Sequence, residues 1–163
     1  MKTKIFVLGL HPTSRGFGWI LFDGPLSAFD WGAPHPSRDK HDACLSRLRK
    51  LLTHYRPTIV TLEHFEGVDS RRAPRIRELG TAMIALARES GSEVAVYPRN
   101  AISRTFATTA TQTRQDIAEL VAREIAQLRS YLPRPRKLWE GEHSSLAIFC
   151  AAACALTWYA EHL

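Results

Sequence analysis

The sequence predicts an α/β protein in which a mixed five-stranded sheet is flanked by helices. Three short apolar segments follow one another early in the chain, separated by turns too short to hold a helix. From about residue 39 the apolar residues adopt the three- and four-residue spacing of amphipathic helices, and strand-like segments alternate with them. Early hairpins followed by alternating helices and strands are typical of this architecture.

The three early strands are expected to form an antiparallel meander at one side of the sheet. The first, at residues 4–10, is nearly continuous in apolar residues, as in a central strand buried on both faces. The second covers residues 16–22 and the third residues 26–31, with Gly24 and Pro25 forming the turn between them.

The next helix and strand are delimited by their periodicity. Apolar residues from Cys44 to Tyr55 recur at helical spacing, which predicts an amphipathic helix that begins near Asp39 and ends at Arg56 before a proline. The β-branched segment 58–62 then predicts a strand that finishes at Glu63.

A second helix is predicted at residues 75–90, because Pro74 favours its first turn and Gly91 favours its end. Residues 94–97 form the last predicted strand, and residues 98–105 a helical turn or two.

The remainder of the chain is expected to be helical apart from one basic loop. Thr113 and Asp116 have the spacing of a capping box, and the apolar residues that follow predict a helix that reaches Leu132. A proline-rich loop at residues 132–137 precedes the last helix, residues 144–159, which is apolar nearly all round and therefore buried.

Composition limits the class of protein. A length of 163 residues fits one domain, residues 1–163, and the charge of +6 is compatible with an anionic partner. Three cysteines give no disulfide framework, and Cys150 and Cys154 stand in an apolar run, as expected of buried thiols in a reducing compartment. The longest apolar run has about 14 residues, which is too short to span a membrane. We therefore expect a cytoplasmic protein that does not cross a membrane.

Five segments carry short motifs in a specific order. They are LGLHPTSRGFGW at 8–19, IVTLEHF at 59–65, ELGTA at 78–82, YPRNAIS at 97–103 and HSSLAI at 143–148. Together they resemble RuvC-type Holliday junction resolvases over essentially the whole chain. The resemblance implies a ribonuclease H-like fold, a Mg²⁺- or Mn²⁺-dependent endonuclease site, branched DNA as partner, and a homodimer that matches the two-fold symmetry of a four-way junction.

The resemblance also places the acidic metal ligands of that family on this sequence. The first-strand position holds His11, and the fourth-strand position keeps Glu63. Aligning the LAI of the last motif puts Ser144 and Gly141 where the family has two aspartates, so that one carboxylate of four is kept. The implied catalytic and metal-binding set comprises Glu63, His11, Glu142 and His143. The cofactor is Mg²⁺ or Mn²⁺ if this site is active, and none if it is degenerate; a site with imidazole ligands suits transition metals better than Mg²⁺.

Each of these residues also has a structural interpretation. His11 and Glu63 both stand at strand ends, where a polar side chain commonly bonds to a loop or forms an ion pair. Ser144 is a residue type that favours the N-cap of the following helix. The small residues 150–155 are either close-packed core or a helix–helix seam between two copies of the chain.

Basic residues gather in several segments near the expected site. Such clusters attract phosphate backbones through charge and counterion release, whereas a solvated basic face is the alternative. The candidate nucleic-acid-binding residues are Arg15, Arg71, Arg72, Arg75, Arg77, Arg99, Arg104, Arg134, Arg136 and Lys137.

The sequence thus predicts a RuvC-like protein that recognises branched or otherwise structured DNA and has an impaired metal-dependent nuclease site. Two alternatives stay open at this point. One is an active structure-specific endonuclease with an unusual ligand set, and the other is a non-catalytic scaffold of the same fold that binds no nucleic acid.

Overall fold

A computed structural model describes residues 4–64, 73–106, 113–137 and 139–163. Its five strands are β1 (Val7–Pro12), β2 (Phe17–Gly24), β3 (Ser27–Gly32), β4 (Ile59–Glu63) and β5 (Glu93–Tyr97). They form one sheet in the order β3-β2-β1-β4-β5. The first three strands are antiparallel neighbours, and β1, β4 and β5 run parallel. The predicted fold class, a mixed sheet that begins with an antiparallel meander, is confirmed.

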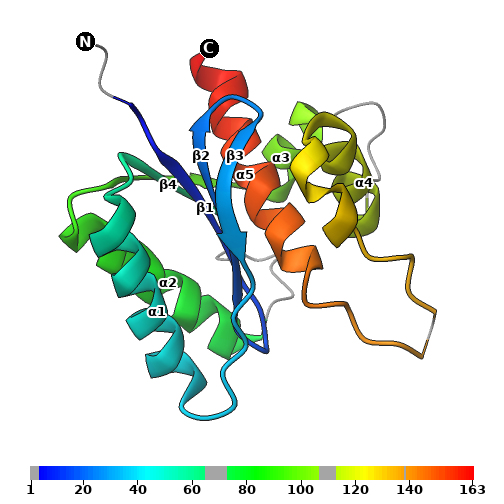
Figure 1. The fold of residues 1–163 in the computed structure, drawn as a ribbon. Coiled ribbons are helices and arrows are strands. Elements are labelled where there is room, and N and C mark those ends of the chain that lie inside the picture. The colour runs from blue at the N-terminus through cyan, green and yellow to red at the C-terminus, as the bar shows by residue number, and fades with distance from the viewer. Residues whose placement is uncertain (1–3, 65–72, 107–112, 138) are drawn as a thin grey trace.

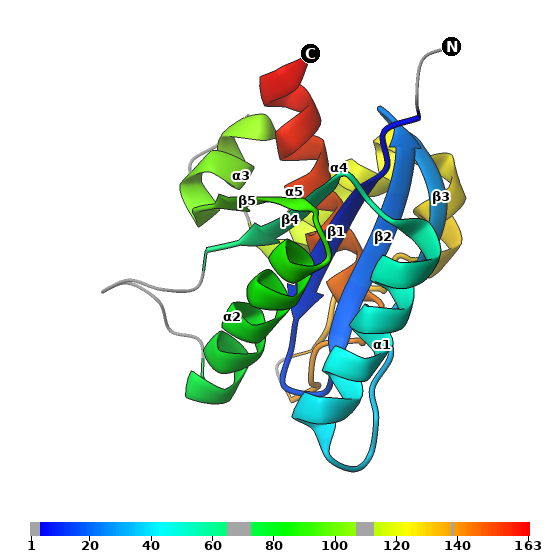
Figure 2. The same ribbon diagram turned by 90° about the vertical axis from the view of Figure 1, so that its left-hand side faces the viewer.

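Helices cover both faces of this sheet (Figures 1 and 2). One face carries α1 (Lys40–Tyr55) and α2 (Pro74–Glu89), which are adjacent to each other. The opposite face carries α3 (Arg99–Thr105), α4 (Arg114–Glu124), the 3₁₀ helix η1 (Ala126–Tyr131) and α5 (Leu146–His162).

The central strand β1 is buried on both faces, as its continuous apolar character predicts. All six of its residues are buried. Leu8 and Leu10 belong to the core beneath α1 and α2, whereas Val7 belongs to the core beneath α5. This division follows from the two-residue period of side chains along a strand.

Two glycines let α5 lie directly on the sheet. A Cβ added to Gly9 of β1 would overlap the carbonyl oxygen of Ala151, and one added to Gly18 of β2 would overlap the backbone of Ala147. Ala147 and Ala151 are four residues apart, so they stand on one face of α5. These two contacts determine where the first two turns of α5 meet the strands.

Two features of the helices bear on the sequence predictions: where α4 ends, and where the small residues of α5 lie. The Thr113–Asp116 capping box is confirmed, but α4 ends at Glu124 and the chain continues as η1 after an extended Ile125. An apolar spacing of three residues fits a 3₁₀ helix as well as an α-helix, so periodicity did not detect the break. The run of small residues from Cys150 to Ala155 is buried within the chain, which confirms the interpretation as close-packed core.

The predicted capping role of Ser144 is wrong. Helix α5 begins two residues later than expected, and its N-cap residue, Ser145, makes no side-chain capping bond. The backbone amides of residues 146, 147 and 148 instead donate to the carbonyl groups of residues 143, 144 and 145. Among the described residues, no helix has both the length and the apolar character that crossing a bilayer requires.

Candidate functional site

The candidate site lies at the carboxyl ends of the parallel strands. His11 stands at the end of β1, Glu63 at the end of β4, and Arg99 directly after β5. Because β1, β4 and β5 are parallel, these ends meet at one edge of the sheet, where ligands commonly bind in open α/β sheets. His11 is only 2% exposed and lines a pocket of about 320 Å³ at this edge.

The turn between β1 and β2 forms one wall of the pocket. The Thr13 amide donates to the Gly16 carbonyl at 2.9 Å, and the Thr13 hydroxyl accepts from the amides of Arg15 and Gly16. These bonds close the turn over residues 13–16 and leave the Arg15 side chain at the surface. Phe17 then donates its amide to the carbonyl of Pro34, which fixes the segment before α1 beside the turn.

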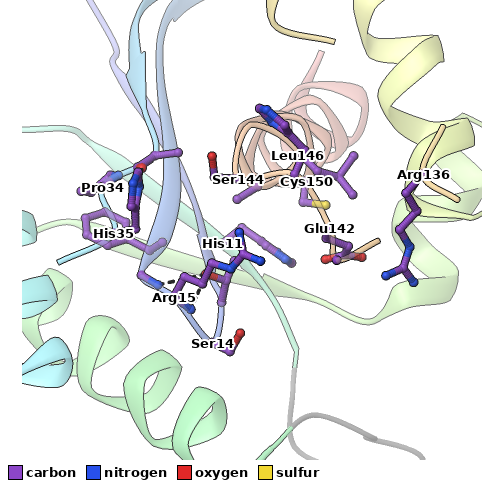
Figure 3. Close-up of a pocket in the computed structure, with 17 residues that line it drawn as sticks. His11, Ser14, Arg15, Pro34, His35, Arg136, Glu142, Ser144, Leu146 and Cys150 are labelled. Carbon is purple, nitrogen blue, oxygen red and sulfur yellow. Dashed lines mark hydrogen bonds between the residues drawn. The ribbon is translucent and has the colours of Figure 1, made fainter. Parts of the chain in front are cut away.

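The start of α5 and the loop before it form the other wall (Figure 3). Gly141 and Ser144 line the same pocket as His11, as do Glu142 and His143. Three of the four implied catalytic residues therefore come together here. Further lining residues are Ser14, Arg15, Pro34, His35, Arg136, Leu146 and Cys150.

The imidazole of His143 is engaged with the start of α5. Its Nδ1 accepts the backbone amide of Ser145 at 3.1 Å and lies 2.7 Å from the Ser145 hydroxyl oxygen. His143 thus holds the loop before α5 to the start of that helix, and its Nδ1 is occupied by these contacts.

Arginines surround the pocket and a larger adjoining one of about 1030 Å³. Arg114 pairs with Glu142 at 3.1 Å, and Arg134 pairs with Glu140 at 3.7 Å. Arg15 and Arg136 line both pockets, and within the described part of the chain neither has a carboxylate partner within 4.0 Å. Arg136 is held instead by the backbone carbonyl of Glu140 at 3.2 Å.

The guanidinium of Arg15 lies beside Gly141. A Cβ added to Gly141 would lie 3.1 Å from Nη2 of Arg15. Gly141 is one of the two positions where the resemblance places a family aspartate. At that position this chain has no side chain, and a cation lies beside it.

Glu63 lies on the strand beside that of His11 but does not line the pocket that holds the other three implied ligands. It is 9% exposed, does not line either pocket, and its carboxylate lies 3.9 Å from the Arg99 guanidinium. Its charge also acts on a buried thiol: burial first, and then the Glu63 carboxylate, hold the pKa of Cys154 well above its usual value.

The residues present do not fit a pair of hard divalent cations. Across residues 4–64, 73–106, 113–137 and 139–163, no three His, Cys, Asp or Glu side chains are grouped so that they could hold a metal ion. Glu63 and Glu142 each pair with an arginine, and two further arginines line the pocket. Hard cations require several oxygen ligands, and nearby guanidinium groups repel them.

The predicted basic residues are not all at this edge of the sheet. Arg75 donates to the carbonyl of Ser14 at 3.0 Å, which ties the start of α2 to the β1–β2 turn. Arg77 lies further along α2, in a shallow pocket shared with His41. Arg104 lines a pocket with Pro25 of the β2–β3 turn, at the opposite end of the sheet. Arg71 and Arg72 lie outside the described residues.

Arg114 and His35 line these pockets but were not identified as site residues from the sequence. The Thr113–Asp116 capping box accounts for this segment without assigning a role to Arg114. A basic residue at the start of a helix nevertheless indicates a candidate anion contact. His35 belongs to a proline-containing loop, and no local pattern connects that loop to the end of β1.

No protein-family model matches the sequence, and no curated protein matches it. Solved structures do resemble the fold. Thermus thermophilus RuvC in complex with a Holliday junction substrate has a TM-score of 0.69 at 18% identity, covering 97% of this chain and 96% of that one.

Two viral and eukaryotic resolvase structures are also similar. The Fowlpox virus resolvase in complex with Holliday junction DNA has a TM-score of 0.57 at 13% identity over 96% of this chain and 99% of that one. The yeast mitochondrial Holliday junction resolvase Ydc2 has a TM-score of 0.58 at 12% identity over 97% of this chain and 79% of that one. The chain therefore has the ribonuclease H-like fold of RuvC and other Holliday junction resolvases.

Proposed function

We propose that this protein binds branched DNA at the edge of the sheet where His11 lies, and that it does so without a two-metal nuclease centre. The observation that carries the proposal is the composition of the His11 pocket. Arg15 and Arg136 line it without carboxylate partners in the described chain, and Gly141 and Ser144 stand at the expected aspartate positions. A pocket of this composition suits a phosphate oxygen better than a metal ion.

The fold supports the choice of branched DNA. Two of the similar structures are complexes with Holliday junction DNA, and each covers nearly the whole chain. The chain shares the fold of these complexes, and Arg15 and Arg136 line the pocket at its sheet edge. We infer that the four-way junction is the substrate class it recognises, and that a second copy of the chain meets the two-fold symmetry of the junction.

In this proposal the described residues have separate tasks. Arg15 and Arg136 contact phosphate groups. Arg75 acts through the Ser14 carbonyl, because it holds the turn on which Arg15 is displayed. Glu142 lowers the positive charge of the pocket edge through its pairing with Arg114.

The test is a binding assay with a labelled four-way DNA junction and a linear duplex of the same sequence, in Mn²⁺ and in EDTA. We expect junction-selective binding of similar strength in both conditions and no cleavage in either. Arg15→Gln and Arg136→Gln are expected to weaken binding by about tenfold each. Each should also reduce the slope of log K against log salt by about 0.9, the value for one lost phosphate contact.

Arg104→Gln is the matched control, because it removes the same charge at the opposite end of the sheet. Its affinity should equal that of the unmodified protein. Cleavage of the junction in Mn²⁺ would show an active endonuclease and contradict the metal argument. Absence of junction binding would contradict the proposed function and favour the alternative of a scaffold protein that binds no nucleic acid. Equal losses for Arg104→Gln and Arg15→Gln would show general charge attraction in place of a defined surface.

A further inference from the structure

The segment between η1 and α5 carries an aromatic side chain that the core does not use. Residues 132–137 and 139–145 extend away from the body of the molecule between the two helices (Figure 1). Trp139 on this segment is 80% exposed, whereas Trp19 is 9% exposed. A partner that covered this indole would remove its apolar area from water, which is favourable.

Glu140, the residue after Trp139, is held by three contacts. The Glu140 amide donates to the Lys137 carbonyl at 3.0 Å. Arg136 donates to the Glu140 carbonyl at 3.2 Å, and Arg134 pairs with the Glu140 carboxylate at 3.7 Å. The backbone and the carboxylate of Glu140 are thus fixed, and the adjacent Trp139 is exposed to solvent.

Positive charge surrounds this indole. The Lys137 ammonium lies 5.4 Å from the centroid of the Trp139 ring, in the geometry of a cation–π contact. Arg134 and Arg136 stand on the same segment, and the pocket lined by Arg15 adjoins it. An aromatic face beside cations is the combination that binds nucleic acid by stacking on a base while the cations contact the backbone.

We propose that Trp139 is a base-stacking residue, which places its indole against a base exposed at the branch point of the junction, with Lys137 on the neighbouring phosphate. This inference rests on the proposed DNA-binding function and adds a specific contact to it. A linear duplex exposes base faces only at its ends, whereas a branch point offers them in its interior. The contact therefore favours the junction over the duplex.

Stacking and charge are separable because only charge depends on salt. We expect Trp139→Ala to weaken binding to the four-way junction by about tenfold, a loss within the range measured for stacking on one base. Its slope of log K against log salt should equal that of the unmodified protein. Trp139→Phe should restore most of the affinity, because a phenyl ring also stacks. Binding to the linear duplex should change less than twofold.

Leu163→Ala is the matched control, since it removes an apolar side chain of similar exposure at the opposite end of the sheet. A second measurement uses a junction with 2-aminopurine at the branch point. Its fluorescence should be quenched by the unmodified protein and not by Trp139→Ala. Thermal melting of each variant should match that of the unmodified chain because the indole is outside the core.

The outcomes separate this inference from the proposed function. If the unmodified protein selects the junction and Trp139→Ala binds equally well, the stacking role is wrong and the proposed function stands. A loss that is the same on duplex and junction, or that changes the salt slope, also overturns it. If the unmodified protein has no preference for the junction, the proposed function fails and the inference fails with it.

Discussion

The Arg99 guanidinium lies 3.9 Å from the Glu63 carboxylate, and the two differ in their exposure to water. The side chain of Glu63 is 10% exposed and that of Arg99 is 38% exposed. A buried carboxylate without its cation is left poorly solvated, whereas an arginine at the surface regains water when its partner is removed. The loss of stability on removing one partner should therefore be larger when Arg99 is removed than when Glu63 is removed.

This asymmetry predicts unequal effects of two neutral substitutions. Arg99→Gln should lower the free energy of unfolding by about 1–2 kcal/mol, and Glu63→Gln by less than about 1 kcal/mol. Urea denaturation of both variants measures the difference. The reverse order, or a junction-cleaving activity that disappears in Glu63→Gln, would show that Glu63 has a task other than this pairing.

A second prediction concerns the glycines beneath α5. Gly18→Ala should destabilise the protein by about 2–3 kcal/mol, because the new methyl group meets the backbone of Ala147 and a helix cannot yield locally. Gly24→Ala is the control: its Cβ would lie 3.8 Å from that of Ser27, an ordinary contact, and the change should be within about 0.5 kcal/mol. Thermal or urea unfolding gives both values. Equal stability of the two variants would mean that α5 does not approach the strands this closely.

A third prediction concerns alkaline pH. The Tyr55 hydroxyl donates to the Asp30 carboxylate. This bond, and then burial, raises the pKa of Tyr55 to about 12 from an ordinary value of 10.0. Between these two pKa values the folded state keeps the phenol of Tyr55 protonated, whereas the unfolded chain ionises it. The hydrogen bond's contribution to the free energy of unfolding is therefore complete below pH 10 and is lost as the pH rises through 12.

The measurement is the stability difference between the unmodified protein and Tyr55→Phe from pH 9 to pH 12. Taking the difference cancels the contributions of other tyrosines, such as Tyr159, whose pKa burial also raises to about 12. The difference should be no larger than about 1 kcal/mol at pH 9, because Tyr55 is partly exposed, and should shrink toward pH 12. A difference that is constant across this range would exclude the Asp30 bond.

A fourth prediction concerns the reactivity of the cysteine thiols. Burial raises the pKa of Cys44 and, with the charge of Glu63, the pKa of Cys154, so both are poor nucleophiles. Cys150 lines the His11 pocket and, at 9%, is the most exposed of the three cysteines. Mass spectrometry after brief alkylation should find Cys150 modified first, and bound junction DNA should slow that reaction. Faster labelling of Cys44 would contradict the described burial.

The sequence predicts most of the fold because each element has its own local period. The continuous apolar run of the first strand, buried on both faces, and the helical spacing from Cys44 onward are both confirmed by the structure. The break at Ile125 was not predicted, because an apolar residue every three positions serves both helix types. The late start of α5 was also not predicted. It depends on the hydrogen bonds that the backbone carbonyls of residues 143–145 accept, which a rule about capping side chains does not include.

The candidate site was predicted less completely, because contacts between distant segments determine it. Motif order placed His11 and Glu142 beside one pocket, but nothing local shows that Arg99 pairs with Glu63 or that Arg15 lies beside Gly141. Arg104 was grouped with the other arginines because it stands near Arg99 in the sequence. Helix α3 carries it to the other end of the sheet.

The position of α5 has a consequence for how the chain reaches its native state. This helix packs on β1 and β2, yet more than 100 residues separate it from them in the sequence. Contacts between such distant segments form late and slow the folding of a domain, because the intervening loop must first close. During synthesis the apolar face of the meander stays uncovered until residues 146–162 have emerged, so this face is the surface that a chaperone or an aggregating neighbour meets first.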